Sequence, residues 1–347
     1  RCAIVTGVQT CALPISGDII GSPYEHRRVG LRDSPLFHPL STWTDDTVLS
    51  LAVAQAILSD RPYGEVMRQF AQMYPDAGYG GSFLRWMQDE QALPYGSWGN
   101  GSAMRSPAIG YAFDSVGEVI DQAQASAIPT HDHPEGIKGA QAVAASVFLA
   151  RDGKSKDQIR QFVESEFEYD LSRNLADIRP TYRFDVSCQG SVPEAILCFL
   201  ESSSWEDAVR NAVYLGGDSD TLACMAGAIA EAWYGATPDA VIARVGAALP
   251  MHLHTVARSF RSRFGPRSEA RAPQYVTGSL ETGDKNLKIA DTGSADIDAA
   301  ELSNADLHSD YFAQNVGFMP SDDTDFSALR PVDVEEVSGD LSNTDVA

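Results

Sequence analysis

Apolar residues recur between residues 47 and 234 of the chain with the 3.6-residue period of amphipathic helices. Their spacing predicts helices over residues 47–58, 64–74, 136–150, 156–168, 192–200, 205–215 and 221–234. In the second of these, Val66, Phe70 and Met73 fall on one face, which predicts that this face is buried. The chain shows no series of alternating apolar and polar residues typical of strands, and no internal repeat. The pattern therefore predicts an all-α body with glycine-rich loops between its helices.

The composition excludes some classes of partner. The chain has 347 residues, with 26 Lys and Arg against 48 Asp and Glu and a formal net charge of −22. Nucleic acids and anionic membranes both attract a cationic protein face, so we expect neither a nucleic-acid partner nor membrane binding. No apolar run approaches the ~20 residues that a transmembrane helix needs.

Charge and pattern also divide the chain into three segments. Residues 266–347 contain 17 acidic and 5 basic residues, are rich in Ser, Asp, Thr and Gly, and show no helical period. This composition predicts a disordered acidic extension. Within it, residues 311–326 are the candidate for binding to another part of the protein. Residues 1–16 show neither a helical nor a strand period, and we interpret them as a non-native or junction segment. Residues 17–265 then form the folded domain.

The cysteines bear on the compartment and on the kind of metal site. Cys2, Cys11, Cys188, Cys198 and Cys224 show neither a CxxC pair nor a Cys/His spacing typical of zinc sites. Free thiols in a reducing compartment are the simplest interpretation, and we expect a cytoplasmic location.

Two short acidic motifs stand at the starts of predicted helices. Residues 44–47 read Thr-Asp-Asp-Thr, and residues 216–221 read Gly-Gly-Asp-Ser-Asp-Thr. For either motif alone, a helix N-cap explains one Asp as well as a function does. Several carboxylates packed together are electrostatically costly unless a cation lies among them, however. Oxygen ligands without Cys or His suit Mg²⁺ or Mn²⁺ rather than zinc.

Other candidate residues lie in turns. The glycine clusters at 78–81 and 96–102 let backbone amides approach a ligand, although helix ends and turns also explain most glycine clusters. Glu25 follows the segment 17–24 on a turn, where a glutamate is more often a surface residue than a catalytic one.

Taken in order, the segments GDIIGSPYE, TDDT, GSWGNGSAMR and GGDSDT resemble the ADP-ribosylglycohydrolases, relatives of dinitrogenase reductase-activating glycohydrolase. The resemblance runs from about residue 17 to about residue 264 and makes residues 17–265 the catalytic domain. It implies a compact orthogonal helical bundle with two Mg²⁺ ions in a central cleft. It also implies hydrolysis of the N- or O-glycosidic bond between ADP-ribose and a protein side chain, arginine or serine, which reverses ADP-ribosylation.

The resemblance assigns roles residue by residue. It implies metal ligands at Thr44, Asp45, Asp46, Asp218, Asp220 and Thr221. It implies catalytic roles for Glu25, which matches a mobile glutamate of the family, and for Asp45 and Asp46. It implies substrate contacts at Gly78, Tyr79, Gly80, Gly81, Gly96, Ser97, Trp98, Gly99, Asn100, Met104, Arg105, His131 and Val186.

Other functions remain open at the level of sequence. One is hydrolysis of ADP-ribosylated nucleic acid or small molecules. Another is an ADP-ribose-binding or immunity module that acts against an ADP-ribosyltransferase without turnover. The intact carboxylates favour an enzyme, and the expected partner is an ADP-ribosylated protein bound by a monomer. Chance helix caps on an unrelated helical protein are the third alternative, which the ordered series of motifs disfavours.

Overall fold

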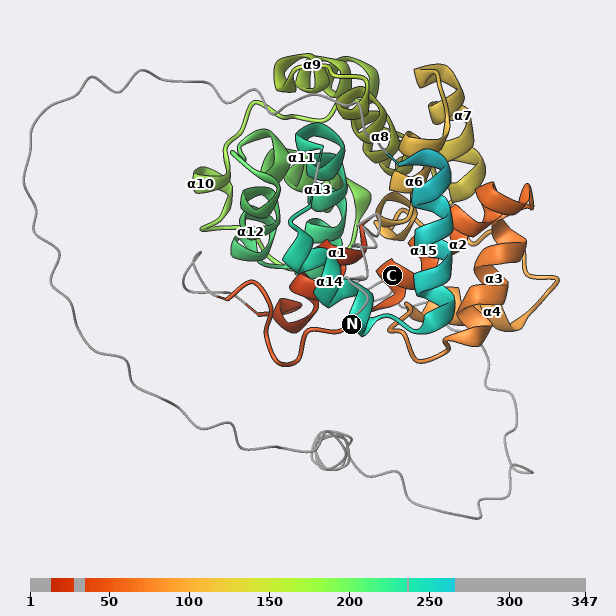
Figure 1. Ribbon diagram of the computed structural model, residues 1–347. Helices are drawn as coiled ribbons and strands as arrows, with labels where there is room; N and C mark the ends of the chain where they lie inside the picture. The colour runs from red at the N-terminus through yellow and green to blue at the C-terminus, as the bar shows by residue number, and fades with distance from the viewer. Residues whose placement is uncertain (1–13, 28–34, 236, 266–347) are drawn as a thin grey trace, which may run out of the picture. The chain divides into compact units, whose positions relative to one another are not determined.

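Helices make up the regular structure of the chain (Figure 1). The computed structural model describes residues 14–27, 35–235 and 237–265. Within these ranges there is no β-strand, and one isolated bridge joins Gly99 to Ser187. The all-α prediction is therefore confirmed. Residues 1–13 and 266–347 lie outside the described residues, and with them the acidic extension, the 311–326 patch and most of the junction segment.

The helices include one short 3-10 turn, η1 (Ser22–Tyr24). The α-helices are α1 (Ile15–Gly21), α2 (Asp45–Ser59), α3 (Tyr63–Met73), α4 (Gly81–Gln88), α5 (Gly101–Met104), α6 (Pro107–Ala112), α7 (Val116–Ala127), α8 (Pro134–Arg151), α9 (Lys156–Phe167), α10 (Leu175–Ile178), α11 (Cys188–Leu200), α12 (Trp205–Leu215), α13 (Ser219–Tyr234), α14 (Asp239–Ala248) and α15 (Met251–Phe264).

Every helix that the apolar period predicted is present, as α2, α3, α8, α9, α11, α12 and α13. One detail was wrong. Val66 and Phe70 are buried, but Met73, the last residue of α3, is 44% exposed. Helix α1 begins at Ile15, and both Ile15 and Ser16 are buried in it, so the folded part starts two residues before position 17.

Helix α13 is the centre of the packing. It contacts α1, α8, α11 and α12, which surround it in Figure 1, and its residues from Ser219 to Glu231 are all buried. Helix α1 lies against it at very short range. A Cβ atom added to Gly17 would lie 2.0 Å from the carbonyl oxygen of Ala223, so only glycine permits this approach. The contact brings Asp18, the acidic residue of α1, beside the acidic residues of α13.

Helix α2 carries the other acidic motif and packs against α3, α6 and α15 as well as α1. Its N-cap residue is Thr44, in extended conformation, and its two aspartates form the first turn. Negative side chains in a first turn are favoured by the partial positive charge of the helix N-terminus. Helix α2 therefore presents its carboxylates toward α1 and α13.

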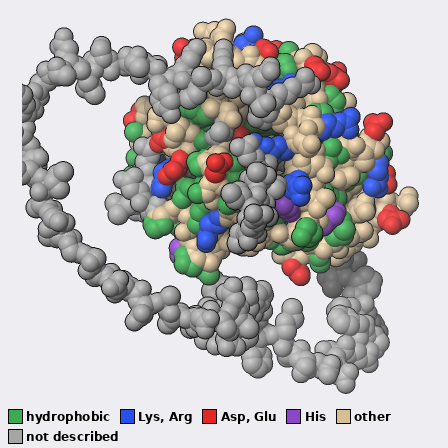
Figure 2. Space-filling view, viewed as in Figure 1, with side chains coloured by type: hydrophobic (Ala, Val, Ile, Leu, Met, Phe, Trp, Pro, Cys, Tyr) green, Lys and Arg blue, Asp and Glu red, His purple; other side chains and the backbone are tan. Residues whose placement is uncertain are grey.

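The surface has mixed charge. On the face shown in Figure 2, Lys and Arg side chains lie among Asp and Glu side chains and form no continuous basic patch. No helix in the described ranges is both long and apolar enough to span a membrane. The described cysteines, Cys188, Cys198 and Cys224, are buried free thiols.

Candidate functional site

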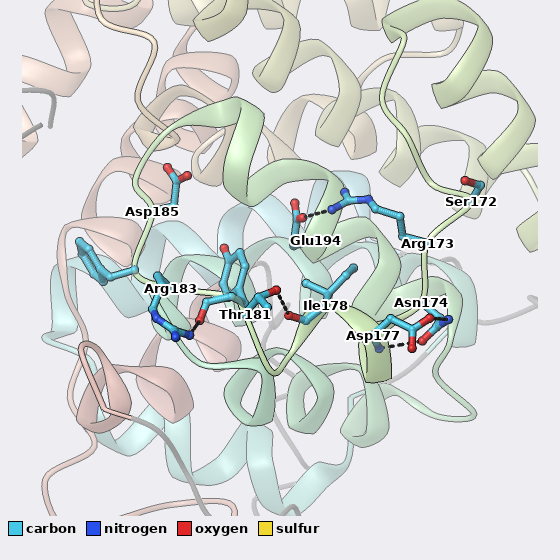
Figure 3. A pocket seen from close by; sticks show the side chains of 11 residues that line it. Ser172, Arg173, Asn174, Asp177, Ile178, Thr181, Arg183, Asp185 and Glu194 are labelled. Carbon is cyan, nitrogen blue, oxygen red and sulfur yellow. Dashed lines mark hydrogen bonds and ion pairs between the residues drawn. The ribbon is translucent and has the colours of Figure 1, made fainter.

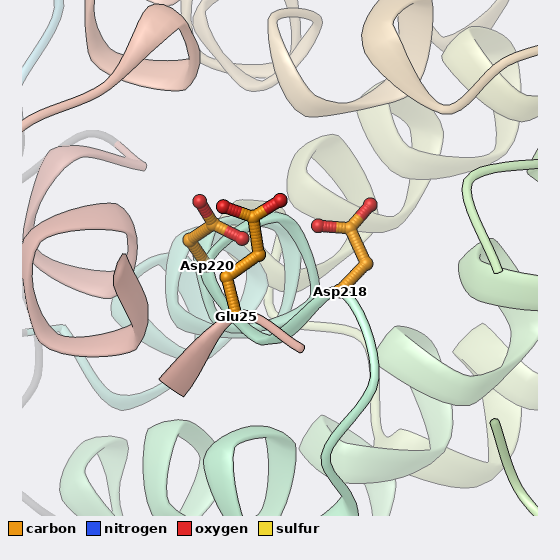
Figure 4. Close-up of side chains that lie close together, drawn as sticks. All are labelled: Glu25, Asp218 and Asp220. Atoms are coloured by element: carbon orange, nitrogen blue, oxygen red, sulfur yellow. The ribbon is translucent and has the colours of Figure 1, made fainter. Parts of the chain in front are cut away.

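Acidic side chains from three distant parts of the chain meet at the N-termini of α2 and α13. The hydroxyl of Thr221 donates to Asp46 Oδ2 at 3.3 Å, which joins the two motifs directly. Oxygen atoms of Glu25, Asp218 and Asp220 all lie within 4.8 Å of one another. These three carboxylates point to the same side of α13 (Figure 4). The structure therefore brings the two acidic motifs and Glu25 together.

Asp18 belongs to the same cluster and was not singled out in the sequence analysis. Its side chain is fully buried and accepts hydrogen bonds from Thr44 N at 3.0 Å and Thr44 Oγ1 at 2.8 Å. It also accepts from Thr47 N at 3.1 Å and from the Thr47 hydroxyl. Asp18 thus holds the first turn of α2 in place through its hydrogen bonds to Thr44 and Thr47. The signal for it was present in the sequence, as the Gly-Asp pair that opens the segment 17–25.

Burial raises the pKa of every carboxylate in the cluster, and the charges of neighbouring carboxylates raise it further for Glu25, Asp45, Asp46 and Asp220. Burial, followed by the charges of Asp18 and Asp218, raises the pKa of Asp45 to about 8. Burial raises the pKa of Asp18 to about 6, against the hydrogen bonds it accepts. The pKa values of Asp46 and Asp220 lie well above the ordinary range for the same reasons, burial first.

The remaining two carboxylates follow the same pattern. Burial is the largest cause of the raised pKa of Glu25, and the nearby charge of Asp218 adds to it. Burial also raises the pKa of Asp218, against its hydrogen bonds. His26 Nε2 lies 3.3 Å from Glu25 Oε1, but no described lysine or arginine forms an ion pair with the cluster. Among the described residues, no lysine or arginine therefore compensates the negative charge of the cluster.

Helix capping does not account for these residues. Asp218 stands at the N-cap position of α13, yet its side chain makes no capping hydrogen bond. Asn100 Nδ2 instead donates to Asp218 Oδ2 at 2.6 Å. At α2 the cap is supplied by Thr44, whose hydroxyl accepts from Asp46 N at 3.3 Å.

The donor set fits a hard divalent cation. Asp46 Oδ1 is buried and has no hydrogen-bond partner among the described residues, so it is a strong acceptor without a donor. The atoms around it are carboxylate and hydroxyl oxygens, the ligands that Mg²⁺ and Mn²⁺ prefer. A cation among these oxygens would offset the repulsion that raises their pKa values.

The predicted substrate loops lie around this cluster. A Cβ atom added to Gly78 would lie 3.6 Å from Asp45 Oδ1, so the 78–81 loop adjoins the carboxylates. Gly80 and Gly81 form the start of α4. The 96–100 loop reaches the cluster through the bond from Asn100 to Asp218.

The 96–100 loop is held in place by backbone pairing with the segment before α11. Asn100 N donates to the carbonyl oxygen of Val186 at 2.7 Å, and Cys188 N donates to that of Trp98 at 2.9 Å. Gly96 N donates to Asp132 Oδ1 at 2.7 Å. Val186 and the 96–100 loop are therefore neighbours.

His131 and Trp98 both lie close to the 96–100 loop or within it. The ring of Trp98 packs 5.4 Å from the ring of His133. A Cβ atom added to Gly99 would lie 3.2 Å from Ser97 Oγ and 3.6 Å from His131 Nε2.

Tyr79, Met104 and Arg105 are among the predicted substrate residues that are buried, together with Ser97, Asn100 and His131. Tyr79 is 7% exposed and stacks on Phe83 with ring centroids 5.1 Å apart, so only its backbone faces the loop. Met104 is 3% exposed, and Arg105 is fully buried. Their side chains support the loops from behind.

A cavity of about 500 Å³ lies next to this site, lined by residues 172–174, 177–178 and 181–185 together with Glu194 (Figure 3). In its wall Arg173 donates to Glu194 at 2.7 Å. The ring of Phe184 lies 4.0 Å from that of His26, the neighbour of Glu25. None of the predicted site residues lines this cavity.

Comparison with known proteins agrees with this arrangement. The ADP-ribosylglycohydrolase family profile matches residues 15–269. The ADP-ribosylhydrolase ARH3 of Homo sapiens is 31% identical over 300 residues of alignment, which cover 63% of this chain and 82% of that protein. The ARH3 of Mus musculus is 32% identical over 302 residues, covering 63% and 81%.

A solved chain described as "ADP-ribosylglycohydrolase-related protein complex" shares the fold. It superposes with a TM-score of 0.59 at 21% identity and covers 74% of this chain and 96% of its own length. The family profile spans well over half of the sequence and includes every acidic residue of the cluster. This chain therefore belongs to the ADP-ribosylglycohydrolase family of glycosidic-bond hydrolases.

Proposed function

We propose that this chain is a hydrolase, dependent on a divalent cation, that releases ADP-ribose from a modified arginine or serine side chain of a protein. The observation that carries the proposal is the cluster formed by the buried Asp46, Asp218 and Asp220 with the partly exposed Glu25, in which Asp46 Oδ1 lacks a donor among the described residues. Family membership and the ADP-ribosylhydrolase relatives support ADP-ribosyl bonds as the substrate class.

The proposed cofactor is Mg²⁺, as two ions, with Mn²⁺ as a substitute. The residues proposed to hold it are Thr44, Asp45, Asp46, Asp218, Asp220 and Thr221. When bound, the cation would orient the ribose hydroxyls and lower the pKa of a bound water. The oxygen-only donor set and the repulsion within the cluster support this assignment.

Glu25 is the proposed acid or base. It is partly exposed, whereas Asp18 and Asp46 beneath it are buried, so it is the carboxylate placed to meet a substrate. Burial and the charge of Asp218 raise its pKa, which lets it hold a proton closer to neutral pH than an exposed glutamate does. The 3.3 Å contact with His26 Nε2 limits the positions its carboxylate can take.

The glycine loops are proposed to bind the diphosphate. Backbone amides bind phosphate oxygens without a lysine or arginine, which suits a chain of net charge −22. Gly78 and Gly96 both have positive φ, 102° and 67°, so each turns the backbone in a way that favours glycine. Substrate bound there would extend from the 96–100 loop to the carboxylates, because Asn100 contacts Asp218.

The test is release of ADP-ribose. The protein is incubated with Mg²⁺ and separately prepared ADP-ribosyl-arginine and ADP-ribosyl-serine peptides, and free ADP-ribose is measured. Turnover of one peptide supports the proposal and identifies the linkage. ADP-ribosylated DNA and small ADP-ribosyl conjugates are assayed in parallel. Release from these alone, or binding of ADP-ribose without release from any substrate, would overturn it.

The setting of the reaction is part of the proposal. We propose a monomer that acts in the cytoplasm. The buried free thiols of Cys188, Cys198 and Cys224 support a reducing compartment. Sedimentation of the full chain and fractionation of cells that express it test the two statements separately.

A further inference from the structure

The cavity shown in Figure 3 lies beside the carboxylate cluster, outside the residues assigned to ADP-ribose. Tyr182 and Phe184 belong to its wall. A Cβ atom added to Gly217, in the acidic motif of α13, would lie 2.8 Å from Tyr182 Cε1. The ring of Phe184 lies 4.0 Å from that of His26. A polypeptide joined to an ADP-ribosyl group at the carboxylates would therefore pass close to this cavity.

Glu194, in α11, is the buried charged residue of the cavity wall. It is 4% exposed, and its Oε1 accepts a hydrogen bond from Arg173 Nη1 at 2.7 Å. Its Oε2 is also buried and accepts no hydrogen bond from any described residue. Burial raises the pKa of Glu194, against the ion pair with Arg173. The one guanidinium that contacts this carboxylate therefore leaves its second oxygen without a donor.

The other charged groups of the wall favour a cation over an anion. Asp177 and Asp185 also line the cavity, so that three carboxylates accompany two guanidinium groups. The side chain of Arg183 points away from Glu194 in Figure 3. Its Nη1 donates to two carbonyl oxygens of its own loop, at 3.3 and 2.8 Å. Arg183 therefore does not supply the donor that Glu194 Oε2 lacks, and the net charge of the wall attracts a positive group.

The size of the cavity suits a single side chain. Its volume is about 500 Å³, within the range of ~300–1,000 Å³ typical of small-ligand pockets. A guanidinium group carries five N–H donors in one plane and is more weakly hydrated than an ammonium group. It therefore loses less hydration than an ammonium when it enters a partly buried site with carboxylate acceptors.

We propose that this cavity binds a basic side chain, an arginine better than a lysine, that lies a few residues from the modified side chain in the substrate protein. Its guanidinium donates to Glu194 Oε2, while Asp177 and Asp185 add electrostatic attraction. The site selects the target and takes no part in bond cleavage. The identity of the polypeptide rests on the proposed function, whereas binding of the cation does not.

The first test measures cation binding without turnover. The full chain is labelled with ¹³C-methyl isoleucine, and excess Mg²⁺ is present so that the probe does not bind at the carboxylate cluster instead. Ile178 lines the cavity, and its signal is identified by its loss in Ile178→Val. We expect N-acetyl-arginine methylamide to shift this signal at least threefold more than the uncharged citrulline analogue does at the same concentration. Equal shifts, or none, would overturn the proposal.

Two substitutions test which carboxylates attract the probe. Glu194→Gln removes the buried charge and should abolish the arginine-specific shift. Asp177→Asn removes an exposed charge and should weaken binding about twofold. Glu166→Gln is the matched control, because Glu166 is exposed on α9 and does not line the cavity, and it should bind the probe as the unmodified chain does.

Folding of the variants is checked by thermal melting, since Glu194→Gln leaves Arg173 without its charged partner. If this variant does not fold, Asp177→Asn and the citrulline comparison decide the matter. An arginine-specific shift that survives Glu194→Gln in a folded protein would show that the acceptor assignment is wrong.

The second test connects the cavity to the choice of substrate. ADP-ribosyl peptides carry one arginine at each of several positions on either side of the modified residue, and each is compared with the same peptide containing citrulline. We expect arginine at one or two positions to lower KM threefold to tenfold with little change in kcat. In Glu194→Gln the ratio of the two KM values should fall to about one.

The outcomes separate the possible sources of the cation. Equal KM values at every position, together with an arginine-specific shift of Ile178, would mean that the cavity takes a free cation such as a polyamine, and the assignment to the substrate protein would be wrong. If no peptide is turned over, the proposed function fails. The same peptides are then compared by equilibrium binding, in which those with arginine should still bind threefold to tenfold more tightly, and equal binding would overturn this proposal as well.

Discussion

Thr221 Oγ1 donates a hydrogen bond to Asp46 Oδ2 at 3.3 Å, although the two residues stand 175 positions apart. The bond joins the first turn of α2 to the first turn of α13. Both helix N-termini therefore direct their partial positive charge toward the same group of carboxylates. This offsets part of the repulsion within the cluster, although Asp46 Oδ1 has no hydrogen-bond donor among the described residues.

Removing one charge from the cluster should abolish turnover without unfolding the protein. Asp218→Asn keeps the size of the side chain but removes a proposed cation ligand, and we expect turnover to fall by a factor of about a hundred or more. In chelator the variant should melt at the same or a higher temperature, because one repelling carboxylate is gone.

Asp114→Asn is the control, since the Asp114 side chain is fully exposed and lies outside the cluster. It should change neither turnover nor melting. Normal turnover in Asp218→Asn would show that the acidic motif of α13 has no part in the reaction.

Chelation should stop the reaction reversibly. In excess chelator we expect no release of ADP-ribose, and Mg²⁺ or Mn²⁺ should restore it better than Zn²⁺, because the donors are all oxygens. The same cations should raise the melting temperature, since an ion that binds only the folded chain stabilises it. Full activity in chelator would rule out the proposed cation site.

The stability of the cation-free protein should decrease as pH rises. The folded pKa of Asp45 is about 8, against an ordinary value of 3.8, so the folded state binds the proton more tightly than the unfolded state. The resulting stabilisation is complete below pH 3.8 and is lost as pH rises through about 8. Thermal melts in chelator across this range measure it, and Mg²⁺ should flatten the dependence. A melting temperature that rises with pH would contradict the assignment.

The contact between α1 and α13 should not tolerate a methyl group. Gly17→Ala would place Cβ 2.0 Å from the carbonyl oxygen of Ala223, so the helices must separate, and we expect a loss of roughly 1–3 kcal/mol with reduced turnover. Gly117→Ala is the matched control, because nothing lies within 4 Å of its Cβ and the residue is within α7. It should raise stability by roughly 0.5–1 kcal/mol. Equal effects of the two changes would show that the close approach is unimportant.

The acidic C-terminal segment should be dispensable for catalysis. Every proposed site residue precedes position 266, so a fragment of residues 1–265 should retain turnover and melting temperature. The deletion changes the net charge of the protein without altering the carboxylate cluster. Comparing how the fragment and the full chain bind a basic protein tests whether the acidic segment affects partner choice. An insoluble or inactive fragment would place the domain boundary elsewhere and make the 311–326 patch the first region to mutate.

The local period of the sequence predicted part of the helices. Apolar spacing identified α2, α3, α8, α9, α11, α12 and α13, because each buries one or more faces against neighbours and the period records those faces directly. The other α-helices were not predicted, including the longer α7, α14 and α15. Helices α5 and α10 have four residues each, about one turn, which is too short for a period to appear.

The candidate site was predictable in part for a similar reason. The residue types and the order of the motifs indicated an oxygen-ligand site and the family, and the family profile confirms the second of these. Which side chains reach a ligand was not predictable. Tyr79 and Arg105 belong to the matched motifs, yet both are buried, and only the packing of the helices decides which side of a loop is covered.

What the sequence by itself determined is thus the helical class, the acidic chemistry and the family, all of which depend on residue type and short-range spacing. What only the tertiary structure decided is which distant groups meet. The role of Asp18 and the bonds from Thr221 to Asp46 and from Asn100 to Asp218 depend on how closely α1, α2 and α13 approach. That approach is set by a glycine backbone contact between helices, and such long-range contacts leave no period in the sequence.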